Sequence, residues 1–300
     1  MRPTVDDLVE AGLVTLDVPL GPLTTYKAGG PARFLAEVGD HEDLERLIDS
    51  GLTREHPLLV IGRGSNLVVA DRGFPGLVIR LGEGFAGIEF DDDRVGAGGA
   101  VPLPRLARAS VDHGLTGLEF FVGVPGSVGG AVRQNAGCFG TETREPLIEA
   151  VVVDLHTGSV STLTPTDLDL SYRHSILEPH QMVTTARFAG HRGDIEAARE
   201  QIRVITRWRK ENQPGGTLNA GSVFKNPEHI TAGELIDTLG LKGLGVGDVT
   251  VSTKHANFFV AGQGAKTADI YRLVQLVKDR VFELSGTKLE PEIQFVGFEE

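Results

Sequence analysis

The sequence predicts a mixed α+β protein with two lobes and a cleft between them. Short β-like runs separated by glycine turns fill the first two thirds of the chain, helical periodicity dominates the last third, and the composition changes near residues 189–194. A length of 300 residues allows two average domains. We therefore expect an N-terminal helical segment at 1–17, a larger domain at 18–190 and a smaller α+β domain at 191–300.

The predicted strands are short apolar runs bounded by turn-forming residues, and they cover 32–38, 57–62, 66–70, 76–81 and 149–155. The predicted helices carry apolar residues at a spacing of three or four, and they cover 40–51, 102–114, 194–210 and 267–285. The last helix has Thr267 as its expected N-cap and ends at Gly286. The final segment, 289–297, alternates and is expected to form a strand with Glu290 and Glu292 on one face.

The composition excludes several classes of protein. The chain has 29 Lys and Arg residues against 41 Asp and Glu residues, a formal net charge of −12, which argues against nucleic-acid binding. The N-terminal residues form no signal peptide, and no stretch approaches the roughly 18 apolar residues of a membrane span. The single cysteine, Cys138, excludes an internal disulfide framework. We expect a cytoplasmic protein with no nucleic-acid, membrane or obligate protein partner.

Glycine is over-represented, with 39 residues in 300 against a usual share of about 7%. The loop GRGSN (62–66) lacks the third glycine of a dinucleotide-binding fingerprint, and a strand follows it where a helix should. Its backbone N–H groups could still form an anion-binding nest, although an ordinary hairpin loop is the commoner outcome. The second glycine-rich stretch, 122–140, is by itself equally consistent with a compact loop and with a cofactor cradle.

Two other chemistries are excluded. The G-x-S-x-G motif of the hydrolase nucleophile elbow is absent. The nine histidines show no H-E-x-x-H motif and no spacing suited to zinc, so we predict no metal site.

Six segments carry a resemblance to a known family: GRGSNLVV (62–69), GLEFFVGVPGSVGGAVRQNAGCFG (117–140), SYRHS (171–175), AGSVFKNP (220–227), VSTKHANFFV (251–260) and LEPEIQFVG (289–297). They resemble the UDP-N-acetylenolpyruvoylglucosamine reductases, flavoenzymes that complete UDP-N-acetylmuramate synthesis for bacterial cell-wall assembly. Matching motifs occur in the same order from Tyr26 to Gly297. The chain is similar to the shorter type of the family, which lacks an extra Tyr-bearing loop.

The resemblance implies that residues 18–190 form an FAD-binding fold of the vanillyl-alcohol-oxidase type, in two subdomains, without a Rossmann unit. The smaller domain would then cover the substrate. The segment YKAGGPA (26–32) and the two glycine-rich loops would approach the cofactor. The implied FAD-binding residues are Gly62, Arg63, Gly64, Ser65, Asn66, Gly123, Val124, Pro125, Gly126, Ser127, Gly129 and Gly130.

The family's reaction has two halves: NADPH gives a hydride to FAD, and reduced FAD then gives one to the methylene carbon of the enolpyruvyl group. Negative charge develops beside the substrate carboxylate, so a cation and a proton donor are needed there. The guanidinium of Arg173 suits this charge, although a lone arginine more often forms a surface ion pair. By resemblance, Arg173, Ser222 and Glu292 are catalytic, and Ser222 is the proton donor.

Other polar residues are implied in binding the substrate or the nicotinamide cofactor. They are Tyr172, Lys210, Lys225 and Asn226. Core packing is as good an explanation for Tyr172, and a turn residue is the ordinary interpretation of a serine such as Ser222. Glu290 is the weaker candidate beside Glu292, because a solvated strand carboxylate explains it as well.

Two other functions compete with this one. An FAD-dependent oxidase or dehydrogenase of the same fold, acting on another alcohol or sugar, would have a catalytic base in place of Ser222 and Glu292. An inactive flavin- or nucleotide-sugar-binding protein would not need Arg173, Ser222 and Glu292 together.

Overall fold

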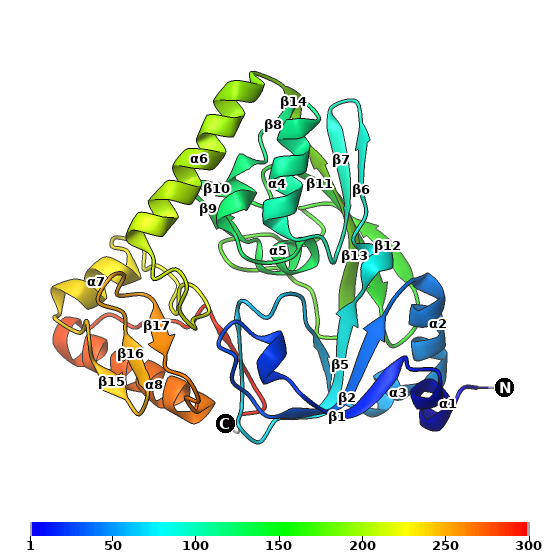
Figure 1. The fold of residues 1–300 in the computed structure, drawn as a ribbon, viewed down its shortest axis with the longest axis horizontal. Helices are drawn as coiled ribbons and strands as arrows, with labels where there is room; N and C mark the ends of the chain where they lie inside the picture. Colours follow the sequence, from blue (N-terminus) through cyan, green and yellow to red (C-terminus); the bar gives the residue numbers. More distant parts are fainter. Residues whose placement is uncertain (1, 299–300) are drawn as a thin grey trace. The chain divides into compact units, whose positions relative to one another are not determined.

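The computed structural model describes residues 2–298, so the ends of the expected segments 1–17 and 191–300 lie outside the described residues. The chain folds into two compact units, each made of separate stretches of sequence (Figure 1). The first unit comprises Met1–Val18, Arg33–Arg63 and Pro75–Trp208, and the second comprises Pro19–Ala32, Gly64–Phe74 and Arg209–Glu300. No helix among residues 2–298 combines the length and apolar character needed to cross a bilayer.

The first unit begins with a four-stranded sheet whose strand order is β1-β2-β5-β3, with β3 and β5 parallel. Its elements are α1 (Val5–Glu10), β1 (Val14–Pro19), β2 (Pro31–Val38), α2 (His41–Ser50), α3 (Leu52–Glu55), β3 (Leu58–Val60) and β5 (Phe74–Leu81). The apolar face of α2, with Leu44, Leu47 and Ile48, packs in one buried cluster with the alternate strand residues Leu77 and Ile79. Burial of these stripes holds the helices against the sheet.

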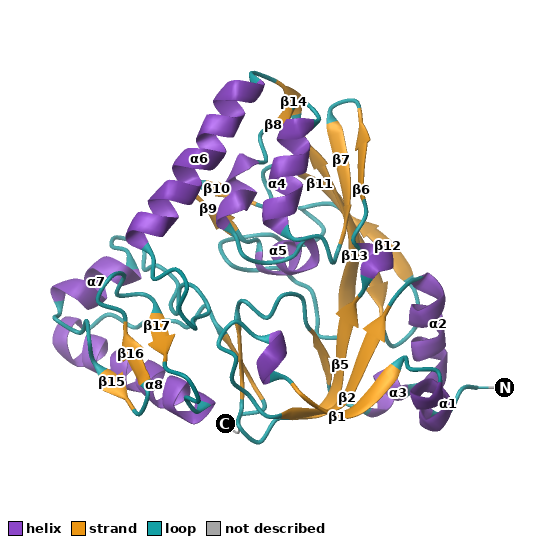
Figure 2. Cartoon of the chain, viewed as in Figure 1, coloured by secondary structure: helices purple, strands orange, loops and turns teal. Residues whose placement is uncertain are grey.

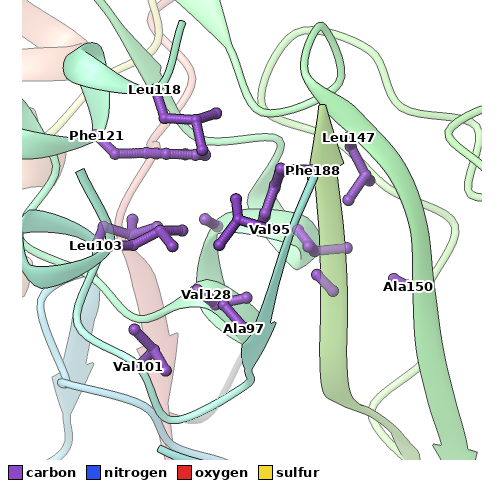
Figure 3. Close-up of a cluster of buried hydrophobic side chains, with 14 of the residues drawn as sticks. Val95, Ala97, Val101, Leu103, Leu118, Phe121, Val128, Leu147, Ala150 and Phe188 are labelled. Atoms are coloured by element: carbon purple, nitrogen blue, oxygen red, sulfur yellow. The ribbon is translucent and has the colours of Figure 1, made fainter. Parts of the chain in front are cut away.

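A second, fully antiparallel sheet of the first unit has the strand order β12-β11-β13-β7-β6. Its strands are β6 (Ile88–Asp91), β7 (Arg94–Gly98), β11 (Leu147–Asp154), β12 (Val160–Leu163) and β13 (Gln181–Ala189). Val95, Ala97, Ala150 and Phe188 alternate onto one face, and Figure 3 shows them within a buried hydrophobic cluster. The buried residues that cover this face come chiefly from α4 (Leu103–Asp112), the 3-10 helix η3 (Glu119–Gly123) and α5 (Val128–Gln134).

The remaining elements of the first unit are short, apart from one long helix. They are the 3-10 helix η2 (Glu83–Phe85), the strand pairs β8 (Leu115–Thr116) with β14 (His191–Arg192) and β9 (Gly137–Cys138) with β10 (Thr141–Glu142), and α6 (Ile195–Asn212). Ile205 of α6 is buried in the same cluster as the second sheet. This contact explains why the first unit extends to Trp208, whereas a boundary at 190/191 was expected from composition.

The second unit pairs β4 (Leu67–Val69) in parallel with β18 (Gln294–Val296), two strands from opposite ends of the chain. Its other elements are the 3-10 helix η1 (Gly21–Leu23), α7 (Ala232–Thr238), β15 (Gly245–Val246), β16 (Val249–Val251), β17 (Phe259–Ala261) and α8 (Thr267–Ser285). Tyr26 is buried in this core, where its hydroxyl donates to the Phe259 carbonyl at 3.2 Å. The stretch 19–32 is thereby attached to the second unit.

Most predicted elements are confirmed in place and type (Figure 2). The helix predicted at 267–285 has those bounds in α8. The loop 62–66 lies between two strands as expected, but β3 and β4 belong to different sheets, so it is not a hairpin loop. The segment 1–17 is helical only over α1, because β1 begins at Val14.

Two expectations near the C-terminus are wrong. Thr267 is not the N-cap of α8; Lys266 is, and the carboxylate of Asp71 accepts the N–H groups of Thr267 (2.9 Å) and Ala268 (3.1 Å). The segment 289–297 is a strand only over Gln294–Val296. Pro291 has no N–H to donate, and it forms only an isolated bridge with Phe224.

His255 lies in the turn between β16 and β17, where the main-chain N–H of Asn257 donates to its Nδ1 at 3.3 Å. Burial lowers the pKa of this imidazole below its ordinary value, and the charge of Lys242 acts in the same direction. The folded state therefore favours the neutral ring, which can accept that hydrogen bond.

We expect His255 to make the protein less stable in acid. The unfolded-state pKa of a histidine is about 6.5. Below that pH the unfolded chain binds a proton at His255 more readily than the folded protein does. The contribution of His255 to stability is therefore fully present above a pH of about 6.5 and is lost as the pH falls. Between pH 7 and pH 5, the melting temperature of His255→Gln, measured by circular dichroism, should therefore fall less than that of the wild type. His229→Gln, at a side chain 93% exposed, is the control and should match the wild type; equal losses for all three proteins would contradict the assignment.

Candidate functional site

Two glycine-rich loops meet in the first unit. A side chain on Gly62 would overlap the hydroxyl of Ser127, so the chain after β3 and the start of α5 are in direct contact. The second loop is tied to the turn before α4, because Val128 donates to the Val101 carbonyl and Gly129 to the Gly99 carbonyl, both at 2.9 Å. A Cβ on Gly129 would also lie only 3.1 Å from the Val183 carbonyl and 3.3 Å from the Gly99 carbonyl, so glycine suits this close packing.

These loops line a cavity of about 130 Å³. The predicted cofactor residues at its wall are Gly62, Arg63, Ser127, Gly129 and Gly130. Residues that the sequence reasoning missed complete the wall, chiefly Gly99, Arg80, Arg133, Gln181 and Met182. The missed arginines lie on a strand and a helix, where nothing in the sequence separates them from ordinary surface charges.

The cavity is cationic: it is lined by Arg63, Arg80 and Arg133 and by no carboxylate. Burial lowers the pKa of Arg133, an effect opposed by the charge of Glu178, and its guanidinium donates to the Glu178 carbonyl at 3.1 Å. Arg80 is paired with Glu37 at 3.2 Å. Backbone close enough for a flat ligand, together with cations for phosphates, fits an anionic dinucleotide such as FAD.

Other predicted cofactor residues have structural roles. Gly64 has φ +60° and lies so close to the Leu23 carbonyl that a larger residue would overlap it. The Asn66 amide donates to the Glu292 carbonyl at 3.0 Å. Ser65 lies beside them in the second unit, and Gly123, Val124, Pro125 and Gly126 run from η3 to α5 in the first without lining the cavity.

Arg173 occupies a tight turn of the first unit, closed by an isolated bridge between Ser171 and His174. Its backbone has φ +54°, a conformation that costs a non-glycine residue about 1–2 kcal/mol. Its guanidinium donates to the Gly137 carbonyl at 3.2 Å and lies 4.9 Å from the Tyr172 ring centre. Tyr172 is 42% exposed, so core packing does not account for it.

Ser222 and Glu292 are brought together in the second unit, although 70 positions separate them in sequence. The Glu292 N–H donates to the Val223 carbonyl at 2.8 Å, and the Lys225 N–H donates to the Glu290 carbonyl at 2.9 Å. The two segments therefore run side by side. Ser222 is half-buried, and its hydroxyl has no hydrogen-bond partner among residues 2–298.

Asn257, which the sequence reasoning also missed, holds the strand-like segment after Ser222. It is 2% exposed and bonds Phe224 at both ends: its Oδ1 accepts the Phe224 N–H at 2.9 Å and its Nδ2 donates to the Phe224 carbonyl at 2.8 Å. Its own carbonyl accepts the Val223 N–H at 2.8 Å. These three bonds fix the backbone next to the serine.

The predicted substrate-binding residues differ in their surroundings. The Lys225 ammonium lies 3.6 Å from the Glu290 carboxylate, so Glu290 is an ion-pair partner. The Asn226 side chain accepts the N–H of Ala232, the first residue of α7, at 3.0 Å. Lys210 is exposed near the end of α6, and its carbonyl accepts the Lys254 ammonium at 2.6 Å.

Comparison with known proteins places this geometry in context. A family model described as an FAD binding domain matches residues 32–164, and one described as UDP-N-acetylenolpyruvoylglucosamine reductase, C-terminal domain, matches residues 213–296. The UDP-N-acetylenolpyruvoylglucosamine reductase of Erythrobacter litoralis is 43% identical over 95% of this chain and 88% of its own length. That of Azorhizobium caulinodans is 40% identical over 98% of both chains.

A solved structure agrees. The crystal structure of UDP-N-acetylenolpyruvylglucosamine reductase from Thermus caldophilus matches with a TM-score of 0.80 and 37% identity, over 94% of this chain and 98% of that one. The α+β fold is thus confirmed, with an FAD-binding domain and a smaller domain that matches the C-terminal domain of these reductases. The cationic, glycine-lined cavity lies mostly on elements within the FAD-binding match. The chain belongs to the UDP-N-acetylenolpyruvoylglucosamine reductase family and is an FAD-dependent oxidoreductase.

Proposed function

We propose that this enzyme uses NADPH to reduce the enolpyruvyl group of UDP-N-acetylglucosamine enolpyruvate, giving UDP-N-acetylmuramate for peptidoglycan precursors. The reaction would take place in the cytoplasm and serve cell-wall growth and division. The observation that carries the proposal is the hydrogen bond between Glu292 and Val223, the residue next to Ser222, in a chain that is 43% identical to a reductase of this name. Proton delivery to a carbon needs a positioned proton donor, and the Ser222 hydroxyl is one such group.

The cavity of the first unit suits the phosphates of FAD on the grounds of its charge and its backbone lining. When bound, FAD supplies a redox-active ring that takes a hydride from NADPH and delivers one to the methylene carbon of the substrate. Arg63 and Arg133, with the backbone at Gly62, Gly129 and Gly130, are the groups suited to its phosphates. We propose that Gly64, Ser65, Asn66 and the stretch 123–127 support these groups.

Ser222 is proposed as the proton donor to the substrate carbon that receives no hydride. Its hydroxyl has no partner within residues 2–298, so a donor is available without breaking a protein hydrogen bond. Its neighbour Val223 is bonded on both sides, to Asn257 and to Glu292, which restricts where the hydroxyl can move. A hydroxyl is a weak acid, so it needs the basicity of the developing enolate and a nearby cation.

Arg173 and Glu292 are proposed to act on the substrate carboxylate. A planar guanidinium can hold a carboxylate and stabilise the charge that spreads onto it as the carbon is reduced. Glu292, on the segment beside Ser222, would assist there in its protonated form. Tyr172, Lys210, Lys225 and Asn226 are proposed to contact the nucleotide sugar or NADPH.

The proposal is tested by following flavin absorbance in the absence of oxygen. The purified enzyme should bleach when NADPH is added and recover when UDP-N-acetylglucosamine enolpyruvate is added. A protein that bleaches but does not recover would keep the flavin chemistry and refute the substrate. Recovery only with another sugar or alcohol acceptor would favour the oxidase or dehydrogenase alternative.

Ser222→Ala should separate the two half-reactions. Loss of a positioned proton donor costs roughly 10²–10⁴-fold, so we expect the rate of flavin reoxidation by the substrate to fall by that factor. Flavin reduction by NADPH should remain within about two-fold. Ser161→Ala, at an exposed serine of β12, is the control. Equal slowing of both half-reactions would show that Ser222 is not the donor.

Arg63→Gln should weaken FAD binding. A charge-assisted hydrogen bond contributes about 1.5–3 kcal/mol, which corresponds to roughly a 10- to 150-fold rise in the dissociation constant. The measurement is titration of the apoprotein with FAD, followed by quenching of flavin fluorescence. Arg94→Gln, at an exposed arginine outside the cavity, should bind FAD normally. Unchanged affinity in Arg63→Gln would remove this residue from the cofactor site.

A further inference from the structure

We propose that Glu142 is a positioning residue for Arg173, acting together with the buried amide of Asn135. The inference rests on the proposed role of Arg173 in reducing the enolpyruvyl substrate. It assigns a role to two residues of the turn around β9 and β10, neither of which was among the predicted site residues.

The Glu142 carboxylate is shared between two arginines. Its Oε1 lies 3.5 Å from Nη1 of Arg173, and its Oε2 lies 3.0 Å from Nε of Arg144. The side chains of Arg173 and Glu142 are each only 16% exposed. Ion pairs that are largely removed from water contribute little net stability, because desolvation offsets their attraction. A contribution to stability is therefore a weak explanation for the presence of the Glu142–Arg173 ion pair.

Asn135 connects the carboxylate to the turn that carries Arg173. Its side chain is fully buried, and its Nδ2 donates to Oε2 of Glu142 at 3.0 Å and to the Ser171 carbonyl at 2.8 Å. Its Oδ1 accepts the Arg144 N–H at 2.9 Å. The Asn135 amide thus bonds both the first residue of the 171–174 turn and the Glu142 carboxylate, which pairs with Arg173 in that turn.

The backbone of this region is held in a costly conformation. Arg173 has φ +54°, in the left-handed region that favours glycine, whereas Asn135, with φ +42°, is the C-cap of α5, where asparagine adopts this conformation readily. The carbonyls that accept from the Arg173 guanidinium belong to Asn135 (3.5 Å) and Gly137 (3.2 Å), in the stretch that the Asn135 amide ties to Glu142. Strain of this kind persists where surrounding contacts enforce it, and it is concentrated at functional sites.

Glu142 would therefore set the direction of the Arg173 guanidinium and leave the reaction of the flavin with NADPH unaffected. The two half-reactions test this directly. In Glu142→Gln, the rate of flavin reoxidation by UDP-N-acetylglucosamine enolpyruvate should fall about 10²-fold, the effect of a misplacement near 1 Å. Reduction by NADPH and FAD content should stay close to those of the wild type, while the melting temperature falls because Arg173 loses its charged partner. Glu45→Gln, at an exposed carboxylate of α2 that is remote in sequence from this turn, is the control and should react normally.

A double-mutant cycle with Arg173→Lys separates positioning from a merely structural role. If Glu142 acts through Arg173, adding Glu142→Gln to Arg173→Lys should slow reoxidation by less than three-fold further. Additive losses, or equal slowing of both half-reactions, would overturn the proposal. Should Glu142→Gln fail to fold, Glu142→Asp keeps the charge at a shorter reach, and a 5- to 20-fold slowing of reoxidation alone is expected.

The failures are distinguishable. If the wild-type flavin is not reoxidised by the substrate, the proposed function falls and this inference falls with it. If Arg173→Lys reoxidises normally while the wild type is active, the function stands and Glu142 has nothing to position. If Arg173→Lys is slow but both Glu142 variants are normal, only the present inference is overturned.

Discussion

The parallel pairing of β4 with β18 is the constraint on which the arrangement of the second unit depends. It joins the chain just after the GRGSN loop to the last strand of the protein, and two further contacts reinforce it. The Asn66 amide donates to the Glu292 carbonyl, and the Asp71 carboxylate caps the first turn of α8. These bonds span about two hundred residues of sequence, so the second unit is assembled from segments that lie far apart in the chain.

The pairing of β4 with β18 also brings the segment that contains Glu292 beside the segment that follows Ser222. Once β18 is paired with β4, the residues before it run beside the segment that follows Ser222, and the Glu292 N–H meets the Val223 carbonyl. Asn257 fixes the other side of that segment by three hydrogen bonds. The backbone next to the serine is therefore held on both sides, while the Ser222 hydroxyl makes no hydrogen bond within residues 2–298.

In the first unit, glycines and arginines form the candidate cofactor site. The contact of Gly62 with Ser127 brings two loops close enough to form a cavity wall of backbone, and three arginines make that wall cationic. In a protein whose net charge is −12, such a concentration of positive charge is a local arrangement for an anionic ligand. The loop 62–66 lacks a complete Rossmann fingerprint and connects two strands. Its residues Gly62 and Arg63 nevertheless line the cavity.

The sequence by itself determined the class of fold, the long helices and the order of the motifs. These depend on periodicity and on local turn chemistry, which each segment carries within itself. Arg173, Ser222 and Glu292 became candidates through the resemblance of the short motifs that contain them to a known family. What the tertiary structure decided is how distant segments complete one another. Four features depend on contacts between elements far apart in sequence. They are the Asp71 carboxylate at the first turn of α8, the packing of Ile205 that joins α6 to the first unit, the place of Arg133 in the cavity wall, and the ion pair of Glu142 with Arg173. Such contacts result from the packing of whole elements, and no local pattern encodes them.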